Sequence, residues 1–348
     1  MSRLPLVGIT MGDPSGIGPE IIVRAMSGQK MKYFCCPVVL GDRNALSSAI
    51  LKSPFEDCRK MEIRVISSPG EVEARTGIIN LIPISDLKDG TFEPGRPSLE
   101  GGEAMVQYIL KAVDMAKKGE IDAMVTCPIS KILMQKAGYK FEGHTQLISH
   151  LTDTNEYVMM LAGERLRVVL VTIHCGLKEV PRILTSEMIQ KTIRITARAF
   201  EEDFGIINPR LAVAALNPHG GESCLFGSEE RDIIIPAVEM AEKEGYRVEG
   251  PFPADTLFHR AASGEYEAVV CMYHDQGLIP LKLLHFSDAV NVTLGLPIIR
   301  TSVDHGTAYD IAGTGKADPS SLRAAIEMAA VMAGNKKVSG DIQDDDGC

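Results

Sequence analysis

Several features that would place a protein in a membrane or in an oxidising compartment are missing from this sequence. Its 348 residues include no apolar run that approaches the roughly 18 residues of a membrane-spanning helix. Gly12, Asp13 and Pro14 interrupt the opening residues too early for a signal peptide. The eight cysteines form no CxxC pair, and Cys127 and Cys271 end apolar runs, where buried free thiols are usual. We therefore expect a cytoplasmic protein.

A general surface for nucleic acid or anionic membrane is also missing. The formal net charge is −10, and no cluster of lysine and arginine offsets it. The composition, 45% hydrophobic and 24% charged, is that of a globular protein, and the length suits two domains. What remains open is a local basic site for a small anion.

The sequence alternates buried strands with amphipathic helices. Apolar runs rich in Val and Ile recur as PLVGIT, CPVVLG, IRVIS, AMVTCP, RVVLVTIH, LAVAALNPH, AVVCMYH and AVNVTLG. Helix-period segments lie at 101–119, 185–205 and 228–245, and Ser186 with Glu187 is typical of a helix start. This pattern predicts an α/β protein with two α/β/α domains and a mixed, largely parallel sheet.

No linker rich in Pro, Gly or Ser separates the two expected domains. We therefore expect the chain to cross between them more than once. The predicted first α/β domain is discontinuous and comprises residues 1–130 and 300–340, and the second comprises 131–299. Residues 341–348 lack an apolar period and are expected to form a tail.

Histidines follow three of the predicted strands. RVVLVTIH ends at His174, LAVAALNPH at His219 and EAVVCMYH at His274. The carboxyl ends of strands in an open α/β sheet form its ligand crevice, and neutral imidazole is the commonest metal ligand. A strand-end histidine is also common as a hydrogen-bonding loop residue, and the long spacing forms no local metal motif. The sequence leaves both interpretations open.

Other strand ends carry polar residues too. MGDPSGIGPE is neither a GxGxxG fingerprint nor a Walker loop, but it places Pro19 at a helix start that suits an anion. FEGHTQ carries His144 and Thr145 in a loop, where a simple polar turn is an equally good interpretation. The region 291–318 is densest in polar residues among glycines, and its Arg300 suits a carboxylate or phosphate.

Six of these motifs, in order, resemble the 4-hydroxythreonine-4-phosphate dehydrogenase family of pyridoxal 5'-phosphate biosynthesis. They are MGDPSGIGPE, TCPISK, GHTQ, NPHGGE, YHDQGLIPLK and NVTLGLPIIRTSVDHGTAYDIAGTGKAD. The last motif is also similar to the cofactor loop of the isocitrate and isopropylmalate dehydrogenase superfamily, whose fold is not Rossmann. The resemblance implies that fold, NAD or NADP as cofactor, one divalent metal ion (Zn, Mg or Co) per site, and a homodimer with shared active sites, whose dimerisation we assign to residues 131–299.

The resemblance also implies a role for each matching residue. The metal ligands would be His174, His219 and His274. The substrate-binding residues would be His144, Thr145, Lys282, Asn291 and Arg300, and the cofactor-binding residues Asp304, Gly306 and Asp310. The catalytic group would include Asp275, Lys282 and Asp255, while the proton acceptor could be Asp275, Asp255 or a bound water. The loop GHTQ departs from the expected GHTE, because neutral Gln146 replaces a carboxylate.

The implied activity is oxidation of a secondary alcohol of 4-hydroxy-L-threonine 4-phosphate, followed by loss of CO₂ from the resulting β-keto acid. Sister branches oxidise 4-phospho-D-threonate, 4-phospho-D-erythronate or a carboxylated cyclic cis-dihydrodiol. Two further alternatives are a three-histidine metallohydrolase, with water at the open coordination position, and a non-enzymatic sensor of a phosphorylated metabolite.

Overall fold

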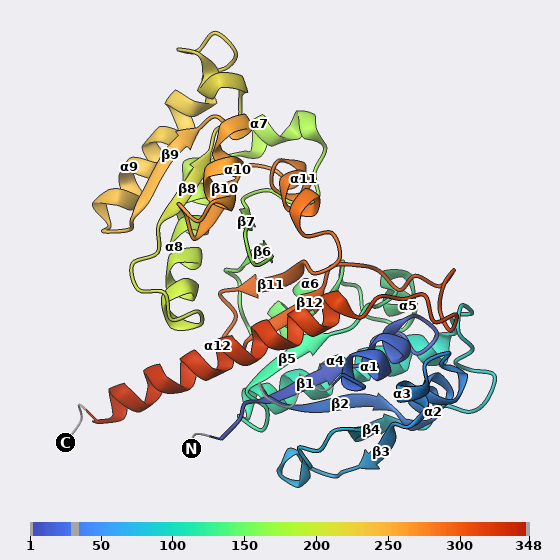
Figure 1. Cartoon of the computed structure of the whole chain (residues 1–348). Coiled ribbons are helices and arrows are strands. Elements are labelled where there is room, and N and C mark those ends of the chain that lie inside the picture. The colour runs from blue at the N-terminus through green and yellow to red at the C-terminus, as the bar shows by residue number, and fades with distance from the viewer. Residues whose placement is uncertain (1–2, 29–34, 346–348) are drawn as a thin grey trace. The chain divides into compact units, whose positions relative to one another are not determined.

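The chain packs into two units, which the computed structural model describes for residues 3–28 and 35–345 (Figure 1). Unit 1 comprises residues 1–155 and 296–337, and unit 2 comprises residues 156–295 together with 338–348. Both are α/β units, which confirms the predicted class. Throughout the described part of the chain, no helix is long and apolar enough to cross a membrane.

Among its described residues, unit 1 contains six parallel strands. In order across the sheet they are β3 (Glu62–Val65), β4 (Ile78–Ser85), β2 (Cys36–Asp42), β1 (Leu6–Thr10), β5 (Ala123–Thr126) and β12 (Arg300–Val303). All five residues of the central β1 are buried, as its unbroken apolar run predicts. The carboxyl ends of these parallel strands therefore form one edge of unit 1.

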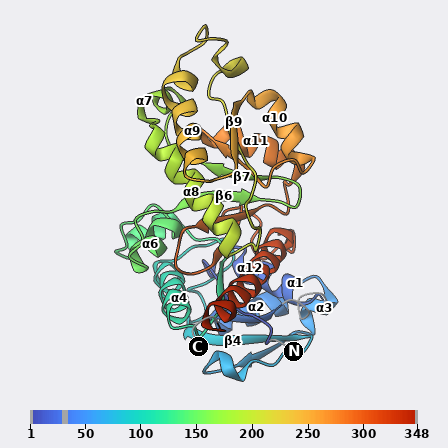
Figure 2. The ribbon, with the colours of Figure 1, turned by 90° about the vertical axis from the view of Figure 1, so that its left-hand side faces the viewer.

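Helices cover both faces of this sheet. On one face α4 (Leu99–Lys117) packs across β1, β2, β4 and β5, while α1 (Gly18–Met26) and α12 (Ser320–Asp345) lie on the other (Figure 2). The remaining helices are α2 (Arg43–Lys52), α3 (Glu56–Arg59), η2 (Pro69–Glu71), α5 (Lys131–Lys136) and α6 (His144–Leu151). Pro19 lies in the first turn of α1, as predicted.

Unit 2 has a mixed sheet. In order across it the strands are β11 (Val290–Leu294), β6 (Val158–Ala162), β7 (Arg167–Leu170), β10 (Ala268–Cys271), β8 (Leu211–Ala214) and β9 (Val248–Phe252). The pairs β11–β6 and β6–β7 are antiparallel, whereas β7–β10, β10–β8 and β8–β9 are parallel. This confirms the mixed, largely parallel sheet.

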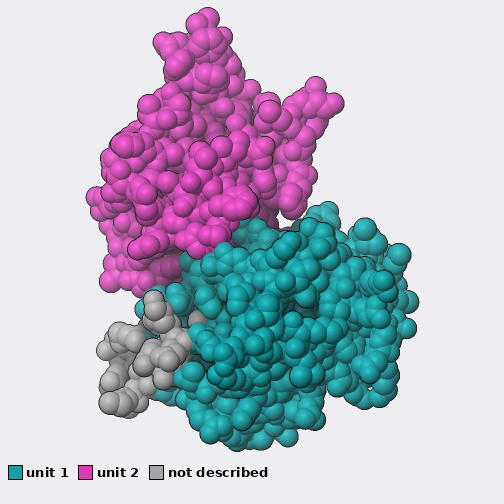
Figure 3. Space-filling view, turned by 45° about the vertical axis from the view of Figure 1, so that its right-hand side comes forward, with its two compact units in different colours: residues 1–155, 296–337 teal, residues 156–295, 338–348 magenta. Residues whose placement is uncertain are grey.

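The boundaries of the units differ from the predicted domains (Figure 3). Residues 131–155 lie in unit 1, because α5 and α6 both pack on α4. The predicted tail at 341–348 is also corrected, since α12 continues to Asp345 and only residues 346–348 lie outside the described residues. A helix that is already packed extends at little cost, because each added residue gains a backbone hydrogen bond.

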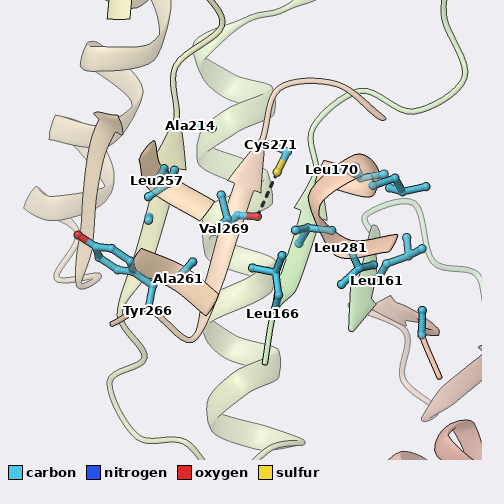
Figure 4. Packing of buried hydrophobic residues seen from close by; sticks show 14 residues of the cluster. Leu161, Leu166, Leu170, Ala214, Leu257, Ala261, Tyr266, Val269, Cys271 and Leu281 are labelled. Atoms are coloured by element: carbon cyan, nitrogen blue, oxygen red, sulfur yellow. Dashed lines mark hydrogen bonds between the residues drawn. The ribbon is translucent and has the colours of Figure 1, made fainter. Parts of the chain in front are cut away.

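The core of unit 2 fixes the helix that begins at His274. The helices of this unit are η3 (Leu177–Glu179), α7 (Val180–Ile183), α8 (Ser186–Glu202), η4 (Pro218–Gly221), η5 (Glu230–Ile234), α9 (Ile235–Lys243), α10 (Ala254–Ala262) and α11 (His274–Leu284). Leu281 of α11 and Leu257 of α10 join one buried cluster with Leu170 and Val269 of the sheet (Figure 4). Burying side chains of this size contributes about 1.5–3 kcal/mol each. This packing holds α11 against the sheet.

Candidate active site

The three strand-end histidines follow three neighbouring parallel strands of unit 2. His174 comes after β7, His274 after β10 and His219 after β8, and these strands are adjacent in the sheet. The topology therefore delivers all three to the carboxyl edge of one sheet, where ligands bind in α/β proteins.

His174 and His274 lie close together because their strands stay paired beyond the sheet. The Val171 N–H donates to the Cys271 carbonyl at 2.9 Å, and the Thr172 N–H to the Met272 carbonyl at 3.2 Å. Two residues further on, the two imidazole rings have centroids 6.1 Å apart. A zinc–nitrogen bond is about 2.0–2.1 Å, so two imidazoles at the tetrahedral angle on one zinc have ring centroids roughly 5.2 Å apart. The two rings therefore lie about 1 Å further apart than two such ligands of one ion.

His219 does not join this pair within the chain. It is the second residue of η4. Its ring lies beside that of Phe226, with centroids 6.3 Å apart. Among residues 3–28 and 35–345, no three His, Cys, Asp or Glu side chains form a group that could hold a metal ion. The three-histidine site therefore stays a prediction, with two of its members adjacent in one chain.

The residues after His274 orient it and hold its helix. Asp275 Oδ1 lies 2.7 Å from His274 Nδ1, an arrangement that fixes the ring and leaves Nε2 available to a metal. Gln276 accepts from the Met272 N–H at 2.7 Å and donates to the Ala215 carbonyl at 2.6 Å, which ties the end of β10 to the end of β8. A Cβ at Gly277 would meet Cys271 Sγ at 3.0 Å, so glycine lets α11 approach the sheet closely. The stretch YHDQG therefore starts α11, orients His274 and ties the helix to the sheet.

Three further candidates lie on separate elements of unit 2. Lys282 lies near the end of α11, with its Nζ 5.9 Å from the centroid of the Phe286 ring. Asn291 lies in β11 and is half-buried. Asp255 is exposed in the first turn of α10. None of these three positions by itself identifies the proton acceptor.

A cationic corner forms in unit 1 around His144. Arg300 opens β12, is only 2% exposed, and donates through Nη2 to Thr126 Oγ1 at 2.8 Å. His144 opens α6, a helix whose first N–H groups have no side-chain cap, and Thr145 follows it. The Nε2 atom of His144 is buried and has no hydrogen-bond partner among the described residues. Burial first, then the charges of Arg300 and Lys131, hold the pKa of His144 well below its ordinary value.

The chemistry of this corner suits an anion. Uncapped helix N–H groups and cations attract phosphate or carboxylate, and a bound anion would give the buried imidazole a partner. Lys131 adds a charge that the sequence-based assignment did not include. A Cβ placed on Gly143 would lie 3.6 Å from Lys131 Cε, so this lysine stem runs beside the start of α6. Burial also lowers the pKa of Arg300, to about 9.

The predicted cofactor loop is fastened to the β1–α1 segment of unit 1. Tyr309 donates to the fully buried carboxylate of Asp13, and the Ile17 N–H donates to the Thr307 carbonyl at 3.0 Å. Further along, the Gly313 N–H donates to Glu20 Oε2 at 2.9 Å. Burial is the largest effect on Asp13 and raises its pKa, against the hydrogen bonds that lower it. The segment MGDPSGIGPE thus serves as a support for the loop.

The three cofactor candidates lie along that loop. The Asp304 N–H donates to Ser321 Oγ of α12 at 3.1 Å, while Gly306 and Asp310 are exposed. Asp310 follows Tyr309 directly, so the Tyr309–Asp13 hydrogen bond fixes the backbone from which its carboxylate projects.

The sequence reasoning missed Gln276, Lys131 and Tyr309. Gln276 and Lys131 stand inside the quoted motifs YHDQG and TCPISK, so motif membership was the available signal. Their roles depend on partners that the fold brings together, such as Ala215 for Gln276 and Gly143 for Lys131.

Two α/β units with polar side chains at the carboxyl ends of parallel strands are the architecture of a protein that binds a small ligand there. Residues 33–329 match the family described as the pyridoxal phosphate biosynthetic protein PdxA. The chain belongs to this family, and it is an oxidoreductase.

Individual relatives agree with this assignment. The 4-hydroxythreonine-4-phosphate dehydrogenase of Desulforapulum autotrophicum is 54% identical over 94% of this chain and 96% of its own. The D-threonate 4-phosphate dehydrogenase of Cupriavidus necator is 44% identical, over 95% of this chain and 98% of its own. The crystal structure of 4-hydroxythreonine-4-phosphate dehydrogenase from Klebsiella pneumoniae has a TM-score of 0.87 at 40% identity, covering 95% and 99% of the two chains. The predicted family resemblance is confirmed.

Proposed function

We propose that the chain oxidises the secondary alcohol of 4-hydroxy-L-threonine 4-phosphate with NAD or NADP, in the cytoplasm. The product is 2-amino-3-oxo-4-phosphooxybutanoate, which loses CO₂ to give 3-amino-2-oxopropyl phosphate. Oxidation moves a hydride to the nicotinamide and a proton to an acceptor. Decarboxylation leaves an electron pair that a proton must quench.

The observation that carries this proposal is the cationic corner of unit 1. A phosphorylated substrate needs a site that neutralises up to two negative charges, which an overall charge of −10 does not supply. Arg300 and Lys131 supply the positive charge of such a site, and the neutral imidazole of His144 and the uncapped start of α6 supply N–H donors. We assign the phosphate to this corner, with Thr145 as a further donor. Lys282 and Asn291 of unit 2 are assigned to the rest of the substrate.

A divalent ion fits the donors at the sheet edge of unit 2. His174 and His274 would hold it, and Asp275 would orient His274 from the far side of the ring. The ion, when bound, would lower the pKa of the substrate hydroxyl and stabilise the negative charge that develops as CO₂ leaves. We propose that a second copy of the chain completes the site, with His219 among the ligands of the shared pair of sites.

The contact between Asp275 and His274 also narrows the choice of proton acceptor. Asp275 already accepts from His274, so we assign it an orienting role and leave the proton to Asp255 or a bound water. Asp304, Gly306 and Asp310 are assigned to the nicotinamide cofactor, on the loop supported by Tyr309 and Asp13. This placement assumes the arrangement of the isocitrate and isopropylmalate dehydrogenases, which we propose for the fold as a whole.

The choice of substrate within the family rests on the relatives. The more similar curated relative is named for 4-hydroxythreonine 4-phosphate and the less similar one for D-threonate 4-phosphate. The two substrates differ at C2, where an amino group replaces a hydroxyl group. Gln146, which stands where a carboxylate was expected, donates to Glu142 Oε2 at 3.2 Å. Glu142 therefore restores an acidic group to this loop.

A substrate panel tests the proposal. Formation of NADH or NADPH is followed with 4-hydroxy-L-threonine 4-phosphate, 4-phospho-D-threonate and 4-phospho-D-erythronate, each with both cofactors and with chelator or added Zn²⁺, Mg²⁺ or Co²⁺. We expect the highest kcat/KM for the first substrate and loss of turnover with chelator. A higher kcat/KM for 4-phospho-D-threonate or 4-phospho-D-erythronate would show that the chain is a dehydrogenase of that phosphorylated sugar acid instead. Phosphate release or hydrolysis without reduced cofactor would support a metallohydrolase, and binding without turnover a sensor.

A further inference from the structure

The turn that carries His219 has an unusual backbone. Positive φ angles occur at six consecutive residues: His219 (52°), Gly220 (65°), Gly221 (81°), Glu222 (43°), Ser223 (55°) and Cys224 (71°). L-residues avoid this region, because Cβ approaches the following carbonyl oxygen, and consecutive occupancy is rare. Four of the six residues have side chains. Contacts from outside the turn must therefore hold it in this conformation.

Glu230 supplies contacts at the entry to this turn. Its carboxylate is 4% exposed and accepts from the Leu216 N–H at 2.8 Å, the Asn217 N–H at 2.7 Å and Asn217 Nδ2 at 2.9 Å. The neighbouring Glu229 accepts only from Asn217 Nδ2 in the described contacts, at 2.7 Å. Glu230 also opens the π-helical turn η5, and such turns often mark functional sites. One buried carboxylate thus fixes the two residues from which the chain enters the His219 turn.

The turn itself packs on the same carboxylate. A Cβ at Gly221 would lie 2.7 Å from Glu230 Oε2, whereas a Cβ at Gly220 would meet nothing within 4 Å. The turn closes where the Phe226 N–H donates to the Gly221 carbonyl at 3.2 Å. His219 therefore lies between an entry fixed by Glu230 and a glycine that rests against Glu230.

We infer that Glu230 is the positioning residue of His219, holding the left-handed turn so that the imidazole is presented to the metal ion. This inference rests on the proposed role of His219 as a metal ligand. Without the carboxylate, the turn relaxes toward ordinary backbone angles and the imidazole leaves its place. Metal binding then has to restore a disfavoured conformation, which weakens affinity.

Glu230→Gln and Glu229→Gln form a matched pair of variants. Each removes one negative charge and one acceptor of the Asn217 Nδ2 group, but only Glu230→Gln also removes the charge from the carboxylate that accepts the Leu216 and Asn217 N–H groups. Metal-free protein is titrated with Co²⁺, by calorimetry and by visible absorption of the bound ion. We expect Glu230→Gln to weaken Co²⁺ affinity about 10- to 100-fold, as outer-shell changes do. Glu229→Gln should stay within about threefold of wild type.

A second pair covers the case in which Glu230→Gln fails to fold. Gly221→Ala and Gly220→Ala both place a methyl group at positive φ, but only the former displaces Glu230. We expect weaker Co²⁺ binding in Gly221→Ala than in Gly220→Ala by about tenfold. Chymotrypsin cleavage at Leu225 and Phe226, measured on metal-free protein, should accelerate in the same variants.

The outcomes separate this inference from the proposed function. If His219→Ala binds Co²⁺ as tightly as wild type, the metal role of His219 fails and the inference fails with it. If His219→Ala weakens binding but Glu230→Gln does not, although its turn is cleaved faster, then only the positioning role is overturned.

Discussion

Arg300 is the side chain on which recognition of the phosphate should depend most. It is buried, its guanidinium is held by Thr126, and it lies beside His144 in the cationic corner. Its loss removes a charge-assisted contact in a site of low polarity. We expect Arg300→Ala to cost about 2–4 kcal/mol of transition-state binding, or roughly 30- to 1000-fold in kcat/KM for the phosphorylated substrate.

Arg167 provides the matched control for this change. It is half-buried and burial lowers its pKa, but its guanidinium lies over the ring of Phe200, 5.7 Å from the centroid, at the end of β7 remote from His174. Arg167→Ala should lower stability without changing the preference for a phosphorylated over a dephosphorylated substrate. An equal loss of kcat/KM on both substrates in Arg300→Ala would assign Arg300 to the carboxylate or the cofactor instead.

His144 should make the free energy of unfolding depend on pH. Its folded-state pKa is well below the ordinary 6.5, so below that pH the unfolded chain takes up a proton that the folded chain does not. Stability is therefore present above about pH 6.5 and is lost as pH falls, by up to about 1.4 kcal/mol per pH unit. His144→Asn should flatten this slope. Urea unfolding of wild type and His144→Asn between about pH 7.5 and 5.5 measures this slope, and equal slopes in the two proteins would contradict the prediction.

The residues of the site were predictable only in part. The strand-end histidines stand out in sequence because each follows an unbroken apolar run, and the topology does place them after adjacent strands. Gln276 and Glu230 do not stand out, because their partners, Ala215 for one and Leu216 and Asn217 for the other, lie 13 to 61 positions away. Hydrogen bonds of that kind leave no periodic signal.

At the scale of elements, α11 should be sensitive to how it packs against the β6–β7 hairpin. His285, which caps this helix, accepts from the Arg165 N–H through Nε2 at 3.2 Å, and its Nδ1 lies 3.1 Å from Asp288 Oδ2. A Cβ at Gly163 would lie 2.2 Å from the ring of His285. We expect Gly163→Ala to lower the free energy of unfolding by about 1–3 kcal/mol and to reduce turnover, since α11 carries His274 and Lys282.

Gly334→Ala is the control for this substitution. Gly334 lies in α12, and a Cβ there would meet nothing within 4 Å. Because alanine favours helix over glycine, this variant should gain up to about 1 kcal/mol and keep its turnover. Urea titration measures the free energy of unfolding of both variants, and steady-state kinetics measures their turnover. If Gly163→Ala changed neither quantity, the ring of His285 would be free to move away from the added methyl group.

All eight predicted apolar runs contain strands, but β4, β6, β9 and β12 were not among them. The strand β12 has the polar sequence RTSV. This strand is nevertheless fully buried, since Arg300 and Ser302 bond Thr126 and Thr301 bonds the Ala325 carbonyl. Small errors had local causes: Thr185 caps α8 in place of Ser186, whose hydroxyl donates to the Ile233 carbonyl.

At the scale of the whole molecule, the two-unit division follows from packing that no local pattern records. The segment 131–155 carries ordinary helices, and only their contacts with α4 assign them to unit 1. Cys127 and Cys271 are fully buried free thiols, as predicted, and burial raises the pKa of both. The burial of individual side chains was therefore more predictable than the unit to which a segment of the chain belongs.

The active species should be a dimer, because α11 and the residues after it expose apolar side chains beside the proposed metal site, which the ligands of one chain do not complete. Leu283 is 82% exposed and Phe286 80%, and Ile279 lies one turn before Leu283. Exposed apolar patches of this kind mark interfaces. Leu283→Asp should shift the protein to monomer in sedimentation and abolish both turnover and tight Co²⁺ binding. Ile207→Asp, at a residue that is 88% exposed, should change none of these. A Leu283→Asp monomer with full activity would show that one chain holds a complete site.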